Sequence, residues 1–208
     1  MPDFEIEDSL NCMVAGVDEA GRGPWAGPVV AGAVIIRDRN LGDELLKGLD
    51  DSKKLSAKKR ELLYEKLREK EKNGRLFIGI GQASAEEIDR CNILQATFAA
   101  MKRAVEALKE KPEFAIIDGN QPRKDFPCRT RTVVKGDARC MSIAAASIAA
   151  KVYRDHLMRE LAQKYPYYAF EKNAGYGTKA HIDGLKRHGV TPEHRKSYRP
   201  IQEFLHSA

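Results

Sequence analysis

Residues 14–24 read Val-Ala-Gly-Val-Asp-Glu-Ala-Gly-Arg-Gly-Pro, an apolar run that carries two adjacent carboxylates and then breaks into a glycine-rich turn. The valines favour a strand, and Asp18 and Glu19 lie at its end. Successive side chains of a strand point to opposite faces, so both acids reach one place only if the chain turns there, with Gly21 and Gly23 supplying the freedom. Paired carboxylates beside an arginine suit a divalent cation next to a phosphate, although a solvated polar turn has the same composition.

Length and composition limit the class of protein. The 208 residues are enough for one sizeable core, and we expect a single domain over 1–208, with a core at about 13–162 and a C-terminal helical segment at about 163–208. No apolar run approaches the roughly 18 residues that span a bilayer, and the acidic N-terminus does not resemble a secretory signal. The four cysteines lack CxxC spacing, which argues against zinc and disulfides. We therefore expect a cytoplasmic monomer without a membrane partner.

Basic residues are in excess and clustered. Lys and Arg outnumber Asp and Glu by 36 to 30. One cluster lies at 53–60 and another at 123–139. Such patches commonly neutralise phosphates, but basic runs are also typical of solvated helix faces.

The order of elements predicts an α/β core with a mixed sheet, because strands come first and then alternate with helices. The expected strands lie at 13–18, 28–36, 75–82, 114–117 and 132–134. The expected helices lie at 56–72, at 84–110 with a capping box from Ser84 to Glu87, at 141–151, near 179–188, and from Thr191-Pro192 onward. On the fourth of these helices, His181 and His188 are expected at the surface.

Two further acids end or follow strands. Asp118 closes a short buried strand, and Asp137 lies between the last strand and a helix of small residues. An Asp-Gly turn and a helix N-cap are their structural alternatives. If they join Asp18 and Glu19 at one edge of the sheet, the four oxygen donors predict Mg²⁺ or Mn²⁺ and the hydrolysis of a phosphodiester by two metal ions. Asp155 lies too far along its helix to join them and is expected in an ion pair.

Six sequence blocks occur in the order found in type 2 ribonuclease H, and the chain most closely resembles bacterial ribonuclease HII over about residues 13–200. The first block, Gly16 to Pro24, is the most specific of the six. The others are Asp51-Ser52-Lys53-Lys54-Leu55, Ile117-Asp118-Gly119-Asn120, Lys135-Gly136-Asp137, the run from Ser142 to Val152, and Gly175-Tyr176-Gly177-Thr178.

This resemblance implies a ribonuclease H-like fold, with a central mixed sheet flanked by helices and a C-terminal helical extension. It implies hydrolysis of the RNA strand of RNA–DNA hybrids and incision of ribonucleotide-containing duplex DNA on the 5′ side of a single ribonucleotide, as in ribonucleotide excision repair. The products would carry 3′-hydroxyl and 5′-phosphate ends.

The resemblance also implies roles for single residues. The metal-binding acids would be Asp18, Glu19, Asp118 and Asp137. The turn that senses the ribose 2′-hydroxyl would be Gly21-Arg22-Gly23, Tyr176 would stack at the RNA–DNA junction, and Lys53 would lie close to the scissile phosphate.

Two alternatives stay open at this point. A nucleic-acid-binding module without catalysis would use the same basic surface, but its acids would weaken phosphate binding unless a metal intervened. The sister family, ribonuclease HIII, carries an extra N-terminal substrate-binding domain, for which we expect the roughly 12 residues before the first motif to leave no room.

Overall fold

Five strands form one mixed sheet in the computed structural model, which describes residues 2–49, 55–121 and 125–206. The strand order is β3-β2-β1-β4-β5, for β1 Val14–Ala20, β2 Val29–Ile36, β3 Leu76–Ala83, β4 Phe114–Asp118 and β5 Arg129–Val133. The first three strands are antiparallel neighbours, whereas β4 runs parallel to β1 and to β5. The predicted mixed sheet is confirmed, although β5 begins earlier than expected and Val134 lies outside it.

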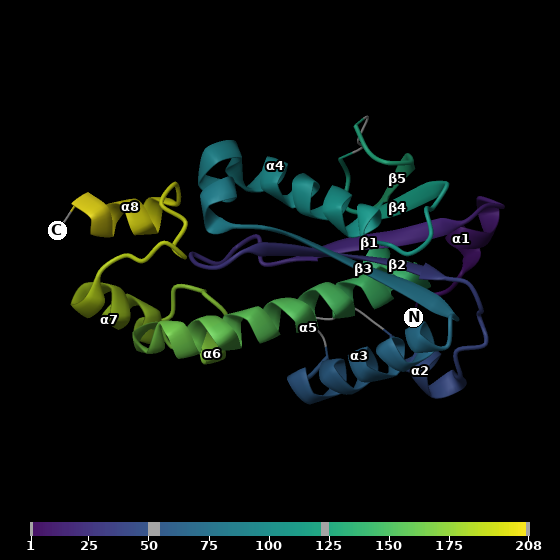
Figure 1. Cartoon of the computed structure of the whole chain (residues 1–208), viewed down its shortest axis with the longest axis horizontal. Coiled ribbons are helices and arrows are strands. Elements are labelled where there is room, and N and C mark those ends of the chain that lie inside the picture. Colours follow the sequence, from purple (N-terminus) through teal and green to yellow (C-terminus); the bar gives the residue numbers. More distant parts are fainter. Residues whose placement is uncertain (1, 50–54, 122–124, 207–208) are drawn as a thin grey trace.

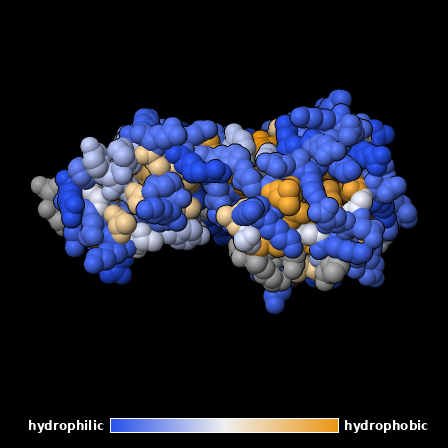
Figure 2. Space-filling view, turned by 90° about the horizontal axis from the view of Figure 1, so that it is seen from below, coloured by the Kyte–Doolittle hydropathy of each residue, from blue (hydrophilic) through white to orange (hydrophobic). Residues whose placement is uncertain are grey.

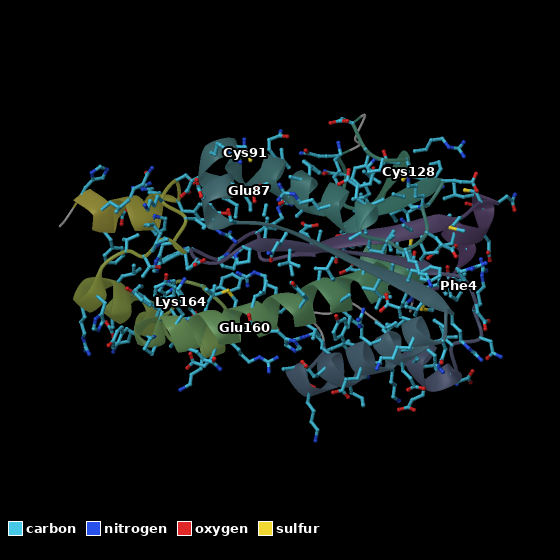
Figure 3. All side chains as sticks on the ribbon, in the orientation of Figure 1. Phe4, Glu87, Cys91, Cys128, Glu160 and Lys164 are labelled. Carbon is cyan, nitrogen blue, oxygen red and sulfur yellow. The ribbon has the colours of Figure 1, made fainter. Side chains whose placement is uncertain are left out.

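Helices cover both faces of the sheet (Figure 1). Helix α4 (Ala85–Glu106) packs on β2 and β3, and α5 (Met141–Lys164) packs on β1 and β2 from the other side. Outside α5 lies α3 (Ala57–Lys72), joined to the short α2 (Asp43–Gly48), while α1 (Glu5–Ser9) precedes the sheet. Figure 3 shows Glu87 and Cys91 on α4 and Glu160 and Lys164 on α5, on opposite sides of the sheet.

Helix α5 lies directly against the backbone of the sheet because both surfaces carry small residues. A Cβ atom on Gly16 would stand 2.3 Å from the backbone nitrogen of Ile143, and one on Gly32 would stand 2.5 Å from the carbonyl oxygen of Ala146. Glycine on the strands and alanine on the helix therefore permit a separation that any larger side chain would prevent. The predicted helix of small residues is confirmed and continues to Lys164.

The start of α4 follows the sequence signal. The Ser84 hydroxyl accepts a hydrogen bond from the Glu87 amide, and the Glu87 carboxylate accepts one from the Ser84 amide, so the predicted capping box is confirmed. At Asn92 the backbone leaves the helical region (φ 66°, ψ 162°), and the Asn92 side chain caps the restarted helix by accepting from the amides of Leu94 and Gln95. The helix expected at 84–110 did not include this kink.

The end of α4 differs from the prediction. The helix stops at Glu106, before the expected position near 110, because the amide of Leu108 bonds to the carbonyl of Val105 and closes a tight turn. The turn buries Leu108, which is 6% exposed, against the sheet. Burial of this side chain outweighs further extension of the helix.

The C-terminal helical extension lies at the far end of α5 (Figure 1). It contains α6 (Phe170–Asn173), α7 (Lys179–His188) and α8 (Arg199–His206) around a small apolar cluster. The prediction of a helix beginning at Thr191-Pro192 is wrong, since the amide and hydroxyl of Thr191 both bond to the ring of His194 and close a turn instead.

The surface on the side of α3 and α5 is mostly hydrophilic, with small apolar patches (Figure 2). In this view the outline narrows between the C-terminal helices and the part that carries α2 and α3. Across the described part of the chain, no helix combines the length and the apolarity needed to cross a bilayer.

Candidate active site

Asp18 and Asp118 lie side by side at the ends of two parallel strands. Val17 pairs with Ile117 in the ladder between β1 and β4, and each strand places its aspartate next. Asp18 is 5% exposed, and burial is the first cause that raises its pKa well above the usual value, followed by the charges of Glu19 and Asp118. The Ser147 hydroxyl of α5 and the Glu19 amide, at 2.7 Å, donate to Asp18 and oppose this shift. The charged form of the Asp18 carboxyl is therefore disfavoured in this environment, and a nearby cation would favour it.

Glu19 follows Asp18 on β1, and its charge contributes to the raised pKa of Asp18. Together with Asp118 it lines a cavity of ≈ 120 Å³, which extends over Gly119 and Asn120 toward α4. Its Oε1 also accepts a hydrogen bond from Arg22 at 3.3 Å. The strand continues to Ala20, so the turn begins two residues later than the sequence suggested.

Asp137 lies in a 3₁₀ turn (Gly136–Ala138) that is attached to Asp118. The Gly136 amide donates to Asp118 Oδ1 at 2.7 Å, and Asp137 is 8% exposed. Asp137 does not cap α5, because the N-cap residue is Cys140. Within residues 2–49, 55–121 and 125–206, no three Asp, Glu, His or Cys side chains are grouped closely enough to hold a metal ion on their own. Asp18, Glu19 and Asp118 are near enough for the charges of the other two to raise the pKa of Asp18, and Gly136, the neighbour of Asp137, bonds to Asp118.

The glycine-rich turn borders a larger groove beside these acids. Gly21 adopts φ +93°, and a Cβ atom there would stand 1.9 Å from Nε of Arg154, so both conformation and space require glycine. The groove has a volume of ≈ 630 Å³ and is lined by Glu19, Ala20, Gly21, Arg22, Gly23, Ile93, Lys151, Arg154 and Tyr176.

Tyr176 stands at the edge of this groove, 53% exposed, with its ring 3.4 Å from the position of a Cβ atom on Gly23. Its backbone is held firmly: the amide donates to the Asn173 carbonyl, and the carbonyl oxygen lies 3.0 Å from Nδ1 of His181. Tyr176 therefore lies beside the Gly21–Gly23 turn, although the two are about 150 residues apart in the sequence. Lys53 lies outside the described residues.

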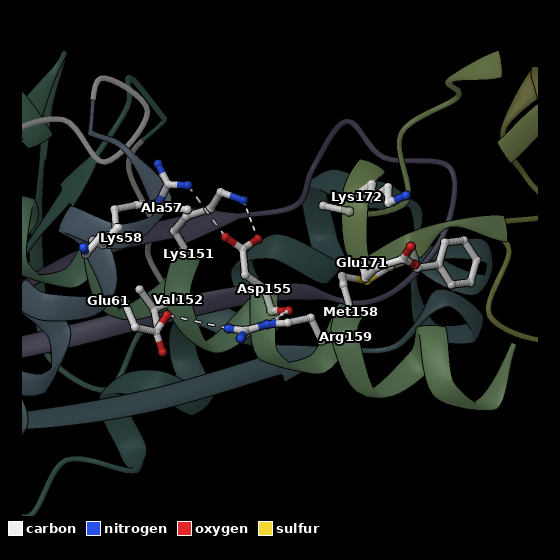
Figure 4. A pocket seen from close by; sticks show the side chains of 13 residues that line it. Ala57, Lys58, Glu61, Lys151, Val152, Asp155, Met158, Arg159, Glu171 and Lys172 are labelled. Atoms are coloured by element: carbon white, nitrogen blue, oxygen red, sulfur yellow. Dashed lines mark hydrogen bonds and ion pairs between the residues drawn. The ribbon is translucent and has the colours of Figure 1, made fainter. Parts of the chain in front are cut away.

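Asp155 forms the ion pairs expected of it. Its carboxylate lies 2.5 Å from Lys151 and 3.9 Å from Arg60 (Figure 4). These residues line a second groove of ≈ 550 Å³ between α3, α5 and α6, and Lys151 lines both grooves. The two grooves thus meet at Lys151.

His181 contradicts its prediction, whereas His188 is exposed as expected. His181 is 0% exposed, with its Nε2 3.0 Å from Nε2 of the equally buried His194. The available signal was its position four residues before the buried Leu185, on the apolar face of α7. Arg195 was missed as well, and no local pattern marks it.

The sheet order, with carboxylates at the shared end of the parallel strands β1 and β4, defines a metal-dependent hydrolase of the ribonuclease H-like fold. Comparison with known proteins narrows this class. The family model for ribonuclease HII matches residues 15–201, and the chain belongs to the ribonuclease HII family, whose members cleave the RNA of RNA–DNA hybrids.

Individual proteins of known sequence or structure are also similar to this chain. The ribonuclease HII of Paramagnetospirillum magneticum is 51% identical over 205 residues, which cover 99% of each chain. The crystal structure of ribonuclease H2 from Pyrococcus horikoshii matches with a TM-score of 0.74 and 28% identity, over 93% of this chain and 97% of that one. Bst-RNase HIII in complex with Mn²⁺ shares the fold at a TM-score of 0.69 and 19% identity, over 94% of this chain and 70% of that one.

Proposed function

We propose that this member of the family cuts the RNA strand of RNA–DNA hybrids and also incises duplex DNA on the 5′ side of a single embedded ribonucleotide, leaving 3′-hydroxyl and 5′-phosphate ends. The observation that carries the proposal is the position of Asp18 and Asp118 on paired strand ends, with Glu19 lining both the cavity of Asp118 and the groove of the Gly21–Gly23 turn and Tyr176. A phosphodiester at the acids would have its neighbouring sugar at the turn.

The proposed metal ligands are Asp18, Glu19, Asp118 and Asp137, and the proposed ion is Mg²⁺ or Mn²⁺. Their oxygen donors fit a hard cation, and the raised pKa of Asp18 reflects a site built for positive charge. Such ions usually combine a few carboxylates with water and substrate phosphate oxygens, which suits acids that do not enclose a cation alone. Two ions bound there would supply an activated water and stabilise the leaving oxygen. A Mn²⁺ complex of a protein with this fold supports the choice of ions.

The proposed recognition of ribose rests on the turn and the tyrosine. The 2′-hydroxyl distinguishes RNA from DNA, and glycines at 21 and 23 let backbone groups approach it closely. The exposed ring of Tyr176 offers a stacking surface for a base or sugar at the junction. We assign Lys53 to the scissile phosphate on the strength of its sequence block alone.

Residues 1–208 are proposed to act as one catalytic domain, as a monomer in the cytoplasm. In support of one domain, the C-terminal segment reaches the turn: Arg195 hydrogen-bonds to the carbonyls of Gly21 and Arg22. The four cysteines are free thiols, which is compatible with a reducing compartment.

The test is cleavage of a 5′-labelled DNA duplex that carries one ribonucleotide, with Mg²⁺, with Mn²⁺ and with a chelator. We expect one product that ends 5′ of the ribonucleotide, that a polymerase can extend, and whose length follows the ribonucleotide when it is moved along the duplex. An all-DNA duplex should stay intact. A folded protein that binds the duplex but cuts it with neither metal would refute the proposal and favour the binding module.

A further inference from the structure

Arg195 is a fully buried guanidinium that lies under the glycine-rich turn. It is 0% exposed, and its Nε donates to the Gly27 carbonyl at 3.1 Å. Nη1 donates to the Arg22 carbonyl at 2.7 Å and to the Tyr198 hydroxyl at 3.0 Å. Nη2 donates to the carbonyls of Gly21 at 2.5 Å and Gly27 at 3.0 Å. These contacts match the five N–H groups of an arginine, and four of them go to the backbone of one turn.

The oxygens to which this charged group donates in these hydrogen bonds are all neutral. Among the described residues, no ion pair involves Arg195 or its neighbour Arg154, whose guanidinium donates to the carbonyls of Pro28, Ala174 and Ala26. A buried charge is costly unless it is well hydrogen-bonded, and apolar side chains would fill the same space at lower cost. The arrangement therefore calls for a reason beyond stability.

The planarity of the peptide bond indicates what the buried Arg195 does for the turn. In a trans peptide the C=O and the following N–H point in opposite directions. Since the carbonyls of Gly21 and Arg22 point to Arg195, the amides of Arg22 and Gly23 point away from it. Within the described residues these two amides have no hydrogen-bond partner, and both residues line the groove of ≈ 630 Å³. Arg195 thus holds two free N–H donors in the direction of the groove.

We propose that Arg195 is a positioning residue for ribose discrimination, which fixes the two amides of the turn where they meet the 2′-hydroxyl and the adjoining phosphate. Arg195 touches no substrate itself, and Tyr198 completes its role by donating from its hydroxyl to the Arg22 carbonyl at 2.7 Å. This inference rests on the proposed function, because it assumes that ribose binds at the turn.

The test compares two tyrosine variants that each remove one hydroxyl from the C-terminal segment. Tyr198→Phe removes the bonds to the Arg22 carbonyl and to Arg195, whereas the matched control Tyr168→Phe removes a bond to the Gly189 carbonyl at 2.9 Å, away from the turn. Arg195→Lys adds a stronger change that keeps the positive charge but offers only three donors.

The readout is the ratio of kcat/KM for a duplex with one ribonucleotide to kcat/KM for the same duplex with a 2′-fluoro sugar at that position. We expect this ratio to fall about fivefold in Tyr198→Phe and more than tenfold in Arg195→Lys, and to stay within twofold of the parent in Tyr168→Phe. The loss should appear for the ribose substrate, while cleavage of the 2′-fluoro duplex changes little, because the acids are untouched.

The inference is overturned if Tyr198→Phe, at the melting temperature of Tyr168→Phe, keeps the parent ratio, or if Tyr168→Phe lowers the ratio equally. If Arg195→Lys does not fold, Tyr198→Phe decides the outcome. Failure of the proposed function is distinct, since the parent protein would then cut neither duplex.

Discussion

His181 and His194 form a buried pair against the backbone of Tyr176, and their protons can be assigned from their partners. Nδ1 of His181 lies 3.0 Å from the Tyr176 carbonyl oxygen, which only accepts, so this nitrogen carries a proton. Nδ1 of His194 accepts from the Thr191 amide at 2.9 Å, so it carries none. The remaining proton lies on Nε2 of His194, which donates to Nε2 of His181 at 3.0 Å. Only this pair of neutral tautomers satisfies every group.

His194→Phe keeps a ring beside Tyr168, whose centroid lies 4.9 Å from that of His194, but it removes the hydrogen bonds of the imidazole with the Thr191 amide, the Thr191 hydroxyl and Nε2 of His181. The Thr191 amide and Nε2 of His181 are then left without these partners. Each unpaired buried group costs about 1–3 kcal/mol, so we expect a loss of about 2–6 kcal/mol in the free energy of unfolding. For a chain of this length that lowers Tm by about 5–20 °C.

The loss should depend on pH in a defined direction. Burial, then the charge of His181, lowers the pKa of His194 from 6.5 to about 4, and burial lowers that of His181 as well. Protons therefore bind preferentially to the unfolded chain, and the parent protein loses stability as pH falls from 6.5 toward 4, by about 1.4 kcal/mol per pH unit for His194. His194→Phe lacks this group, so the difference in Tm between the parent protein and the variant becomes smaller from pH 7 to pH 5.

Thermal unfolding followed by circular dichroism at pH 7, 6 and 5 measures both effects. His188→Phe is the matched control, because His188 is an exposed imidazole on α7, the helix that also carries His181, and its ring centroid lies 3.8 Å from that of Tyr167. We expect its Tm within about 2 °C of the parent. The tautomer assignment would be refuted if His194→Phe and His188→Phe have the same Tm at pH 7. It would also be refuted if the difference in Tm between the parent and His194→Phe stays constant down to pH 5.

Three further predictions concern the site and the sheet. Asp18→Asn should lower turnover more than about 100-fold while duplex binding, measured by fluorescence anisotropy, stays equal or tightens; full activity would remove Asp18 from the metal site. Gly32→Val should cost at least about 2 kcal/mol in urea unfolding, because its side chain meets the Ala146 carbonyl, and an unchanged midpoint would contradict that contact. Lys151→Gln should reduce the slope of log Kd against log salt by about one, whereas Lys164→Gln, outside both grooves, should not; equal slopes would exclude Lys151 from phosphate binding.

Local signals were sufficient for the framework of this fold. Alternating apolar runs with turn residues predicted the strands, and the capping box at Ser84 predicted the start of α4, because these features depend on neighbours within a few residues. The positions of the acids at strand ends could be predicted from the sequence for the same reason. Asp18 and Asp118 are neighbours because β1 and β4 pair in parallel. The sequence predicted a mixed sheet but did not specify which strands pair.

Long-range partners account for the errors. Thr191 has the composition of a helix start, yet its amide and hydroxyl bond to His194 and form a turn. His181 looks like a polar helix residue until the C-terminal segment folds back and supplies His194. Arg195 is surrounded by polar residues in sequence, and only the tertiary fold places it under a turn formed more than 160 residues earlier.

The close contact between α5 and the sheet restricts where this chain tolerates a change in length. Ser147 of α5 hydrogen-bonds to Asp18, and Arg154, seven residues later, packs on Gly21. Met158, one turn further along the helix, packs on Gly27. One inserted residue between Ser147 and Met158 would rotate every later side chain by about 100° and advance it by about 1.5 Å. The carboxylate site and the turn would then lose their common register, even if the helix formed normally. Insertions and deletions among related chains should therefore fall in the loops between elements and after α5, and avoid this segment.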